Sequence, residues 1–528
     1  MIQEQLAHLP EFLPGYRPFP LAQERTAWQG LPLRAKQRFL QAGEAALQTP
    51  IAPLPLSLWL DFTHTGRRTP WETAYFSRRA RLCALVSAEC VEHKGRFLGA
   101  IADTVWALCE ESAWQLPAHN SYVRDTPQLP LPDTTRPIVD LFAAETGALL
   151  ALTRYLLPDE LDTAAPGITA RMERELNTRI LTPYFTSHFW WMGNGEEPMC
   201  NWTSWCTQNV LLTVFLLPTT QQQRQAAVKQ AAYSLDCFLK DYGADGCCNE
   251  GAQYYRHAGL TLWGCLEILS SIVPEAFSPL FHEPKIKNIA EYICNVHVEG
   301  PYYLNFGDCS PLAGRCGARE YRFGQAVGSD ALQALAAADF RADADPDHLQ
   351  NPDGSTHINL WYRLTTAFAE DEMMAYSAAP RHHLTVWYPS VGVYAARQGS
   401  WVLGAKFGSN GDTTTTIPAV LPCTRTADRF SSISGWRATP KRPSAPSGMK
   451  SGPCRAHGTI CPPLTACSSC PARNTLHGRC APRKIASPAN WRARTRPSRG
   501  LPPTAAAYLS ANRASPCGTK RTIPARWS

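Results

Sequence analysis

Two short polar segments of the chain carry side chains that can hold an anion and move a proton. The first, residues 200–206, places Asn201 beside cysteine and tryptophan. The second, residues 245–257, contains acidic, phenolic, cationic and imidazole groups, which belong to Glu250, Tyr254, Tyr255, Arg256 and His257. An amide can bind a carboxylate, and a tyrosine or histidine can exchange a proton. We therefore take these two segments as the candidate site.

The elements around these segments should position them at one rim. Each segment precedes an apolar run with helical spacing, 210–217 after the first and 260–273 after the second. Between them, residues 221–242 read as a helix that ends at Gly243, where a glycine C-cap is expected. This intervening helix can return the chain, so that both polar segments meet.

The body of the chain is predicted to be mainly α-helical. From about residue 71 to 368 the periodicity is helical and the loops are short, which favours an incomplete α/α toroid of helical hairpins over residues 1–380. The runs 384–388, 391–395 and 401–407 are β-branched and aromatic, and they predict the first strands of an antiparallel β-sandwich over residues 381–412.

The charge changes abruptly after this point. Residues 1–412 carry 32 Lys and Arg against 43 Asp and Glu, whereas residues 413–528 carry 19 against one acid. The last segment also holds 16 of the 44 prolines and shows no helical or strand periodicity. We expect a disordered basic tail. Its Arg-rich run 491–496 is not taken as a nucleic-acid site, and Cys467 with Cys470 lacks the second cysteine pair of a zinc site.

No secretory signal or membrane-spanning run is visible, so a cytoplasmic location is expected, with no membrane partner. The 12 cysteines of residues 1–412 are scattered through helical sequence, which fits reduced thiols. Neighbours in a strand point to opposite faces, so His382 and His383 are a weak metal signal.

The order and spacing of several stretches resemble the heparinase II/III-like family of polysaccharide lyases, whose members join an α/α toroid to a β-sandwich. The resemblance covers roughly residues 50–412. Besides the two polar segments, the stretches that carry it are 59–79, WALCEESAWQLPAHN at 106–120, DLFAAET at 140–146 and NFGDCSP at 305–311.

The resemblance implies β-elimination in a glycan that contains uronic acid, such as heparan sulfate or alginate. Asn201 would neutralise the uronate carboxylate, and Tyr254, with Tyr255 as the alternative, would serve as base or acid. The implied substrate-binding residues are Trp114, His119, Glu250, Arg256 and His257. The family implies no cofactor in this part of the chain, although its intact sandwich can hold a divalent metal such as zinc. The oligomeric state stays open.

Each of these residues has a structural alternative. Asn201 is the type of residue that most often caps a helix, and a tyrosine at a helix start usually packs in the core. His257 could be a hydrogen-bonded structural histidine and Trp114 a core residue. Glu250 and the following glycine could form only a turn.

One feature of the family is missing near Asp412. There the family usually shows His-Asn-His-Asn-Asp, from which a histidine completes catalysis, whereas residues 413–418 read Thr-Thr-Thr-Thr-Ile-Pro. The codons CAC-AAC-CAC-AAC-GAT-ACC-GG give this second peptide when reading starts one base later. With free choice of codons, the same shift turns 420–435 into a strand, a turn and a strand. We infer a frameshift close to Asp412, and therefore weak or absent activity.

Two other functions compete with the lyase. A glycoside hydrolase on a similar toroid needs two carboxylates that face one bond, and Glu250 with Asp308 is the pair that the sequence offers. The other alternative is a non-catalytic remnant that only binds a glycan. In each case the expected partner is a polysaccharide or oligosaccharide, and for the lyase it is an acidic one.

Overall fold

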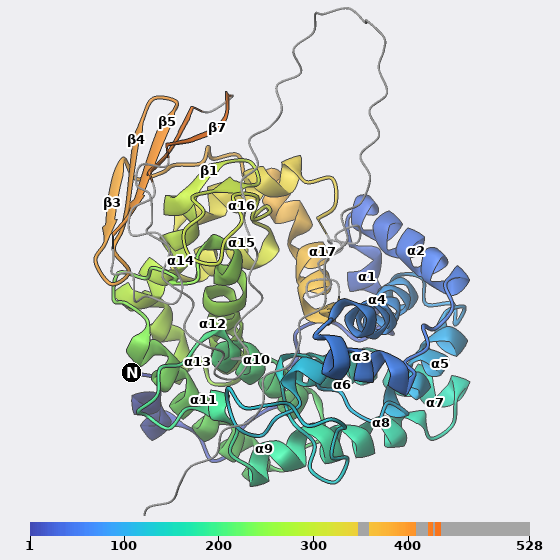
Figure 1. Cartoon of the computed structure of the whole chain (residues 1–528). Coiled ribbons are helices and arrows are strands. Elements are labelled where there is room, and N and C mark those ends of the chain that lie inside the picture. Colours follow the sequence, from blue (N-terminus) through green and yellow to red (C-terminus); the bar gives the residue numbers. More distant parts are fainter. Residues whose placement is uncertain (347–357, 408–420, 426–427, 434–528) are drawn as a thin grey trace, which may run out of the picture. The chain divides into compact units, whose positions relative to one another are not determined.

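The computed structural model describes residues 1–346, 358–407, 421–425 and 428–433. Within them the chain is mainly helical, as expected, with a small antiparallel sheet near the end (Figure 1). The helices are α1 (Arg25–Gln29), α2 (Leu33–Gln48), α3 (Leu56–Thr65), α4 (Thr69–Glu92), α5 (Leu98–Cys109), α6 (Leu141–Leu156), α7 (Pro158–Ala164), α8 (Ile168–Leu176), α9 (Thr182–Thr186), α10 (Asn201–Leu216), α11 (Gln221–Asp241), α12 (Ala252–Ile272), α13 (Pro274–Phe277), α14 (Pro284–Val296), α15 (Ala318–Ala326), α16 (Asp330–Ala342) and α17 (Leu360–Ala375).

Shorter elements connect these helices. Short 3-10 helices are η1 (Gln3–His8), η2 (Pro117–His119), η4 (Trp190–Met192) and η5 (Ser278–His282), and η3 (Asn177–Leu181) is a π-helical turn. The strands are β1 (His297–Glu299), β2 (Tyr302–Tyr303), β3 (Thr385–Tyr388), β4 (Val393–Gln398), β5 (Trp401–Lys406), β6 (Leu421–Arg425) and β7 (Asp428–Ile433). The helices and the sheet fall within one compact unit.

Helix α10 lies at the centre of the helical core. All of its residues except Trp202 are buried, and it packs against α6, α11 and α12. Figure 1 shows α10 between α6 and α12. A helix that is enclosed on every side needs apolar or small polar residues all round, which its sequence of Leu, Val, Thr, Ser and Asn supplies.

Helices α10 and α12 run parallel, and their contacts give the register. The Ser204 and Thr261 hydroxyls are 2.8 Å apart. One turn further along both helices, Gln208 lies against Gly264. Contacts therefore advance in the same direction on both helices. The first turns of α10 and α12 lie at the same end, so the expectation that the two polar segments share one rim is confirmed.

The boundaries differ from the expected ones in a way that matters for the site. Helix α10 begins at Asn201, so the polar residues 201–206 form its first helical turns. Helix α12 begins at Ala252, so only residues 252–257 of the second segment are helical, and residues 245–251 precede the helix. The predicted glycine cap of α11 is wrong. The helix ends at Asp241 with Tyr242 in an extended conformation, and Gly243 does not take a positive φ.

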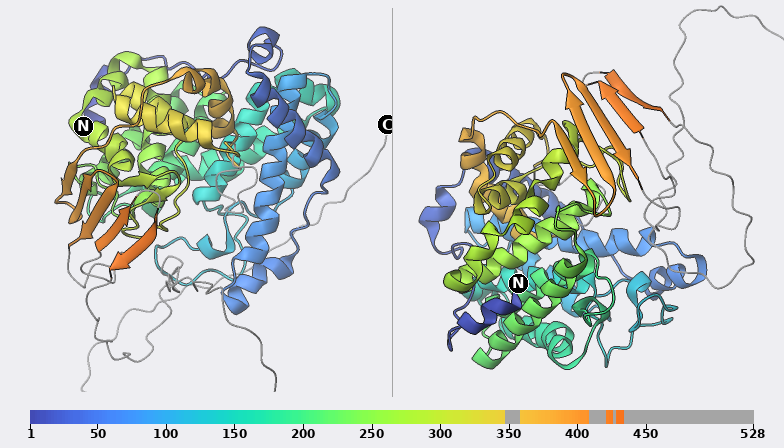
Figure 2. Two further views of the ribbon diagram at one scale, coloured as in Figure 1. Left: turned by 90° about the horizontal axis from the view of Figure 1, so that it is seen from above. Right: turned by 90° about the vertical axis from the view of Figure 1, so that its left-hand side faces the viewer.

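The sheet pairs its strands in chain order, β3-β4-β5-β6-β7, and all neighbours are antiparallel. Figure 2 shows the strands side by side as orange arrows. On one face, Tyr388 and Val402 are buried, and the Tyr388 hydroxyl accepts a hydrogen bond of 2.9 Å from Asn295 of α14. The other face is apolar and exposed, with side chains that belong to Trp387, Trp401, Leu403 and Phe407.

Strands β6 and β7 lie within the segment that was expected to have no regular structure. β5 exposes one edge of unpaired backbone groups, and β6 pairs there with Trp401, Val402 and Leu403. Pairing of this kind uses main-chain donors and acceptors and does not require an alternating side-chain pattern. Hence the absence of strand periodicity from residue 413 did not exclude two strands. The other residues of the expected tail lie outside the described residues.

Candidate functional site

The Asn201 side chain stands at the start of α10 without serving as its cap. Cys200 occupies the N-cap position and makes no side-chain capping bond. Asn201 is 5% exposed, yet its carboxamide has no hydrogen-bond partner among the described residues. A mostly buried amide usually has such partners, so one that lacks them requires an explanation. The capping alternative is excluded, and the amide is available to a ligand.

The two adjacent tyrosines differ in their surroundings. Tyr255 is fully buried and its hydroxyl donates a hydrogen bond of 3.0 Å to the carbonyl of Ala290, while its ring lies 6.0 Å from that of Tyr292. Burial raises the pKa of Tyr255 well above its ordinary value. Tyr255 is therefore a core residue, which removes it as a candidate base. Tyr254 is partly exposed one position earlier, at the shared end of α10 and α12.

His257 lies one turn after Tyr254 and is held by stacking. Its ring lies 4.2 Å from that of Trp205, at an interplanar angle of 11°. Burial, together with the nearby charges of Arg319 and Arg256, lowers the pKa of His257 to about 3. The imidazole is thus neutral at physiological pH. Neither ring nitrogen has a hydrogen-bond partner within the described part of the chain, so the alternative of a hydrogen-bonded structural histidine does not hold.

Glu250 lies in a turn just before α12, and the loop at residues 306–308 holds this turn in place. The Asp308 N–H donates to the Glu250 carbonyl at 3.1 Å. Gly251 has a φ of 91°, and a side chain there would meet the Phe306 carbonyl, so only glycine fits. Burial raises the pKa of Glu250 to about 7, and the Asp308 carboxylate adds to this. Burial also raises the pKa of Asp308. This turn and the loop that contacts it therefore each hold a carboxyl group whose pKa is raised by burial.

Arg256 was expected to bind substrate, and the structure gives it another role. Its guanidinium pairs with Glu320 at 3.3 Å and donates to the carbonyls of Ala313 and, at 3.0 Å, Arg315. These bonds fasten the 313–317 loop to α12. The next residue in a helix points about 100° further round, which explains why His257 faces the site while Arg256 does not.

Trp114 and His119 were expected to line one cleft, but they have different neighbours. Trp114 is 2% exposed, and its indole N–H donates to the Leu108 carbonyl at 2.9 Å. His119 instead lies edge-on to Trp202 of α10, with ring centroids 4.7 Å apart, and its Nδ1 is 2.7 Å from Asp140. The prediction is thus wrong in grouping the two. His119 adjoins the start of α10, and Trp114 does not reach it.

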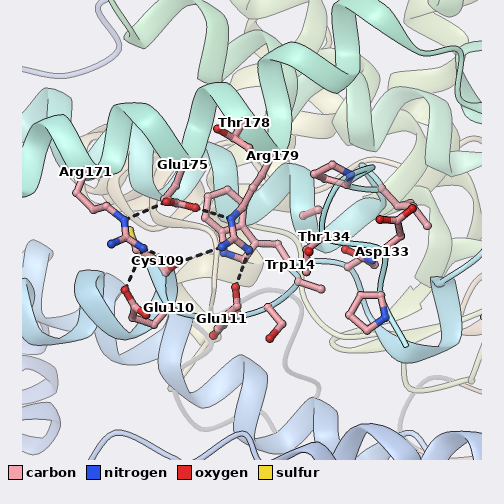
Figure 3. A pocket seen from close by; sticks show the side chains of 17 residues that line it. Cys109, Glu110, Glu111, Trp114, Asp133, Thr134, Arg171, Glu175, Thr178 and Arg179 are labelled. Atoms are coloured by element: carbon pink, nitrogen blue, oxygen red, sulfur yellow. Dashed lines mark hydrogen bonds and ion pairs between the residues drawn. The ribbon is translucent and has the colours of Figure 1, made fainter. Parts of the chain in front are cut away.

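Trp114 lines a separate cavity of about 340 Å³ that is bounded by α5, α8 and η3 (Figure 3). Its cations are paired: Arg171 with Glu110 and with Glu175, at 3.0 Å each, and Arg179 with Glu175 at 2.8 Å. Arg179 also donates to the carbonyls of Cys109 and Glu111. These groups satisfy one another, and the arrangement indicates a structural role.

Arg124 and Trp190 lie near Trp202 at the start of α10, and neither was among the residues predicted for the site. Trp190 lies 5.0 Å from Trp202, and the guanidinium of Arg124 lies 4.6 Å from the Trp190 ring centroid. They come from three separate segments, so no spacing along the chain could show that they meet. The run of aromatic residues at 189–191 was the one local hint.

Comparisons with known proteins add no family assignment. No protein-family model matches the chain, and a search among characterised proteins gives no match. The described residues contain no group of three or more His, Cys, Asp or Glu side chains that could hold a metal ion. None of the described helices is both long and apolar enough to cross a membrane.

Proposed function

We propose that the helical part carries one half of the active site of a lyase, which cleaves a uronic-acid-containing polysaccharide or oligosaccharide by β-elimination. The observation that supports this most is the parallel register of α10 and α12. It brings the unpartnered amide of Asn201 and the phenol of Tyr254 to one end of two uncapped helices. Such helix starts favour an anion, because neither N-cap residue makes a side-chain capping bond and the helix dipole is positive there.

The chemistry follows from these groups. Asn201, aided by the positive end of the helix dipole, binds the uronate carboxylate, which makes the proton on carbon 5 of the sugar more acidic. Tyr254 removes this proton, the electron pair forms a double bond between carbons 4 and 5, and the bond from carbon 4 to the leaving oxygen breaks. The leaving oxygen then takes this proton from Tyr254, which returns Tyr254 to the phenolate form in which it acted as the base. His257 is neutral and stacked on Trp205, and it orients the sugar by a hydrogen bond to a hydroxyl.

We propose that the second half of the active site, which the sandwich domain would supply, is incomplete in this chain. The α/α toroid would be followed by a truncated sandwich, and the histidine of that sandwich would be lost through the frameshift near Asp412. Residues 408–420 lie outside the described residues. The exposed apolar face of β3–β5 supports the proposal, because a sandwich covers such a face with a second sheet. Activity of the chain as it stands is expected to be weak or absent.

The test uses two full-length chains, the present one and one whose reading frame is restored after codon 412. Each is incubated with alginate or heparan sulfate, and the ultraviolet absorbance of the unsaturated product is followed. The restored chain should be active, and its Tyr254→Phe variant should lose about 100-fold or more in rate. Tyr255→Phe is the matched control and should keep most of the activity. Full activity of Tyr254→Phe would refute the assignment.

A glycoside hydrolase is the second candidate, and the raised pKa of Glu250 favours it. A carboxyl with a pKa of about 7 can act as a general acid, with Asp308 as the second carboxylate. A saturated product with a new reducing end, lost in Glu250→Gln, would establish this function in place of the lyase. If acidic glycans bind while neither chain yields any product, the remnant that only binds glycans is the correct description.

A further inference from the structure

A second group of side chains adjoins the start of α10 and takes no part in the proposed chemistry. Trp202 follows Asn201 directly and lies against Trp190, and Arg124 lies over the Trp190 ring. We call Arg124, Trp190 and Trp202 the Arg–Trp cluster. His119 supports it from the other side through its edge-on contact with Trp202.

The contacts place this cluster beside the candidate site. The guanidinium of Arg124 donates a hydrogen bond of 3.2 Å to the carbonyl of Pro198, two residues before the N-cap of α10. The Cys200 thiol at that N-cap has a pKa of about 11, raised mainly by burial and opposed by a hydrogen bond from the Trp202 N–H. The thiol is also within electrostatic reach of Glu250, which contributes to the rise, and of Arg124, which opposes it. Glu250 and the Arg–Trp cluster therefore adjoin the same helix start.

Arg124 has the exposure and the free donors that anion binding requires. Its side chain is 36% exposed, and its nearest carboxylate, the 73% exposed Asp125, is 3.7 Å away. Beyond Pro198, Asp125 and the Trp190 ring, no further partner of this guanidinium lies within the described residues. At least one edge of the guanidinium is thus open to a carboxylate or a sulfate. Both tryptophans are half-buried, so each keeps part of its ring surface accessible.

We propose that the Arg–Trp cluster is a subsite for an acidic sugar next to the sugar at the reaction centre. Arg124 binds the carboxylate or sulfate of that sugar, and the accessible surfaces of Trp190 and Trp202 contact its ring. This inference rests on the proposed function, because that proposal defines where the reaction centre lies. Binding by the cluster itself is independent of whether the chain cleaves anything.

The chemistry of the cluster predicts its selectivity. A guanidinium pairs with a planar anion through two parallel N–H donors, whereas an indole ring packs against the C–H face of a sugar. Stacking on Trp190 holds the guanidinium in place, so the Arg124 side chain loses less conformational entropy when a ligand binds. An acidic oligosaccharide therefore binds more tightly than a neutral one of the same length, and added salt weakens the acidic one selectively.

The experiment measures binding by calorimetry with the full-length chain, so it does not depend on activity. The ligands are an alginate oligosaccharide, which carries carboxylates only, a heparin oligosaccharide, which also carries sulfates, and a cello-oligosaccharide as the neutral reference. Arg124→Gln should weaken binding of at least one acidic ligand about tenfold or more. Arg124→Lys keeps the charge and should lose less. The acidic ligand that responds identifies the anion.

The chain offers a matched control in Arg136, whose guanidinium lies 4.1 Å from the Tyr122 ring in the same loop region. Arg136→Gln removes a similar cation–π contact and should leave binding unchanged. Thermal unfolding of each variant separates loss of binding from loss of folding. Normal binding by Arg124→Gln, equal binding of the neutral ligand, or no binding by the parent chain would each overturn the inference.

The two proposals can fail separately. If Arg124→Gln weakens binding but the frame-restored chain forms no unsaturated product, the subsite stands and the lyase does not. If Tyr254→Phe abolishes elimination in the restored chain while Arg124→Gln binds like the parent, the lyase stands and the subsite does not.

Discussion

The cavity beside Trp114 and the shared start of α10 and α12 are both rich in polar side chains, but they differ in how these groups are paired. In the cavity, Arg171, Arg179 and Glu175 bond to one another. At the helix starts, the Asn201 amide and the His257 imidazole have no hydrogen-bond partner among the described residues. Polar groups that satisfy each other stabilise a fold, whereas groups held in place without partners are free for a ligand.

The sharpest test of this contrast is Glu111→Gln at the cavity wall. Glu111 pairs at 2.6 Å with Arg79, which is fully buried, and at 3.2 Å with Arg78. Removing its charge leaves a buried guanidinium uncompensated, so we expect the free energy of unfolding to fall by roughly 3–5 kcal/mol. Urea unfolding measures this. Glu110→Gln is the control, because Glu110 is 52% exposed and its pair with Arg171 should contribute below about 1 kcal/mol.

The second test concerns Glu250. Its pKa is about 7 in the folded chain against an ordinary value of 4.5, so the folded state loses stability as the pH rises between these values. Glu250→Gln should abolish this decline and make the chain more stable than the parent at pH 8 by roughly 1–3 kcal/mol. Unfolding at pH 4 and pH 8 measures the difference. Equal pH dependence of the two chains would show that Glu250 is hydrated.

A smaller effect should distinguish the two tyrosines. Tyr255→Phe removes a buried hydroxyl that donates to the Ala290 carbonyl, and should cost about 1 kcal/mol of unfolding free energy. Tyr254→Phe should cost less, because Tyr254 is partly exposed. Thermal unfolding of both variants gives the comparison. A larger loss for Tyr254→Phe would mean that its hydroxyl supports the fold.

The smallest change in stability is expected for Asn201→Ala. The amide makes no hydrogen bond within the described chain, and alanine is a good helix former at this position, so the free energy of unfolding should stay within about 0.5 kcal/mol of the parent. In the frame-restored chain the same variant should lose elimination activity. A large loss of stability would place Asn201 with the structural groups of the cavity.

The sequence predicted the helical class, the strands that begin near residue 385 and the shared rim. These follow from local periodicity and from the length of the helix between the two polar segments. The sequence could not rank Tyr254 against Tyr255, because a shift of one residue turns a helical side chain by about 100° from the site into the core.

The outcome for the other site residues depended on contacts between distant segments. The Arg256 guanidinium donates its hydrogen bonds to carbonyls of the 313–317 loop. The Trp114 side chain lines the cavity near α8. Trp190 and Arg124 reach the start of α10 from segments with no motif of their own. Such pairings are set by tertiary packing, and no spacing along one chain encodes them.

The exposed face of the sheet has a consequence for the life of this protein in a cell. Trp387 and Trp401 are about half exposed, and Phe407 is 53% exposed beside them. Chaperones and proteases select chains that display aromatic and aliphatic side chains in this way. We expect a short half-life and a tendency to form inclusion bodies. The amount of folded protein would then limit its activity in the cell more than the rate of any reaction that it catalyses.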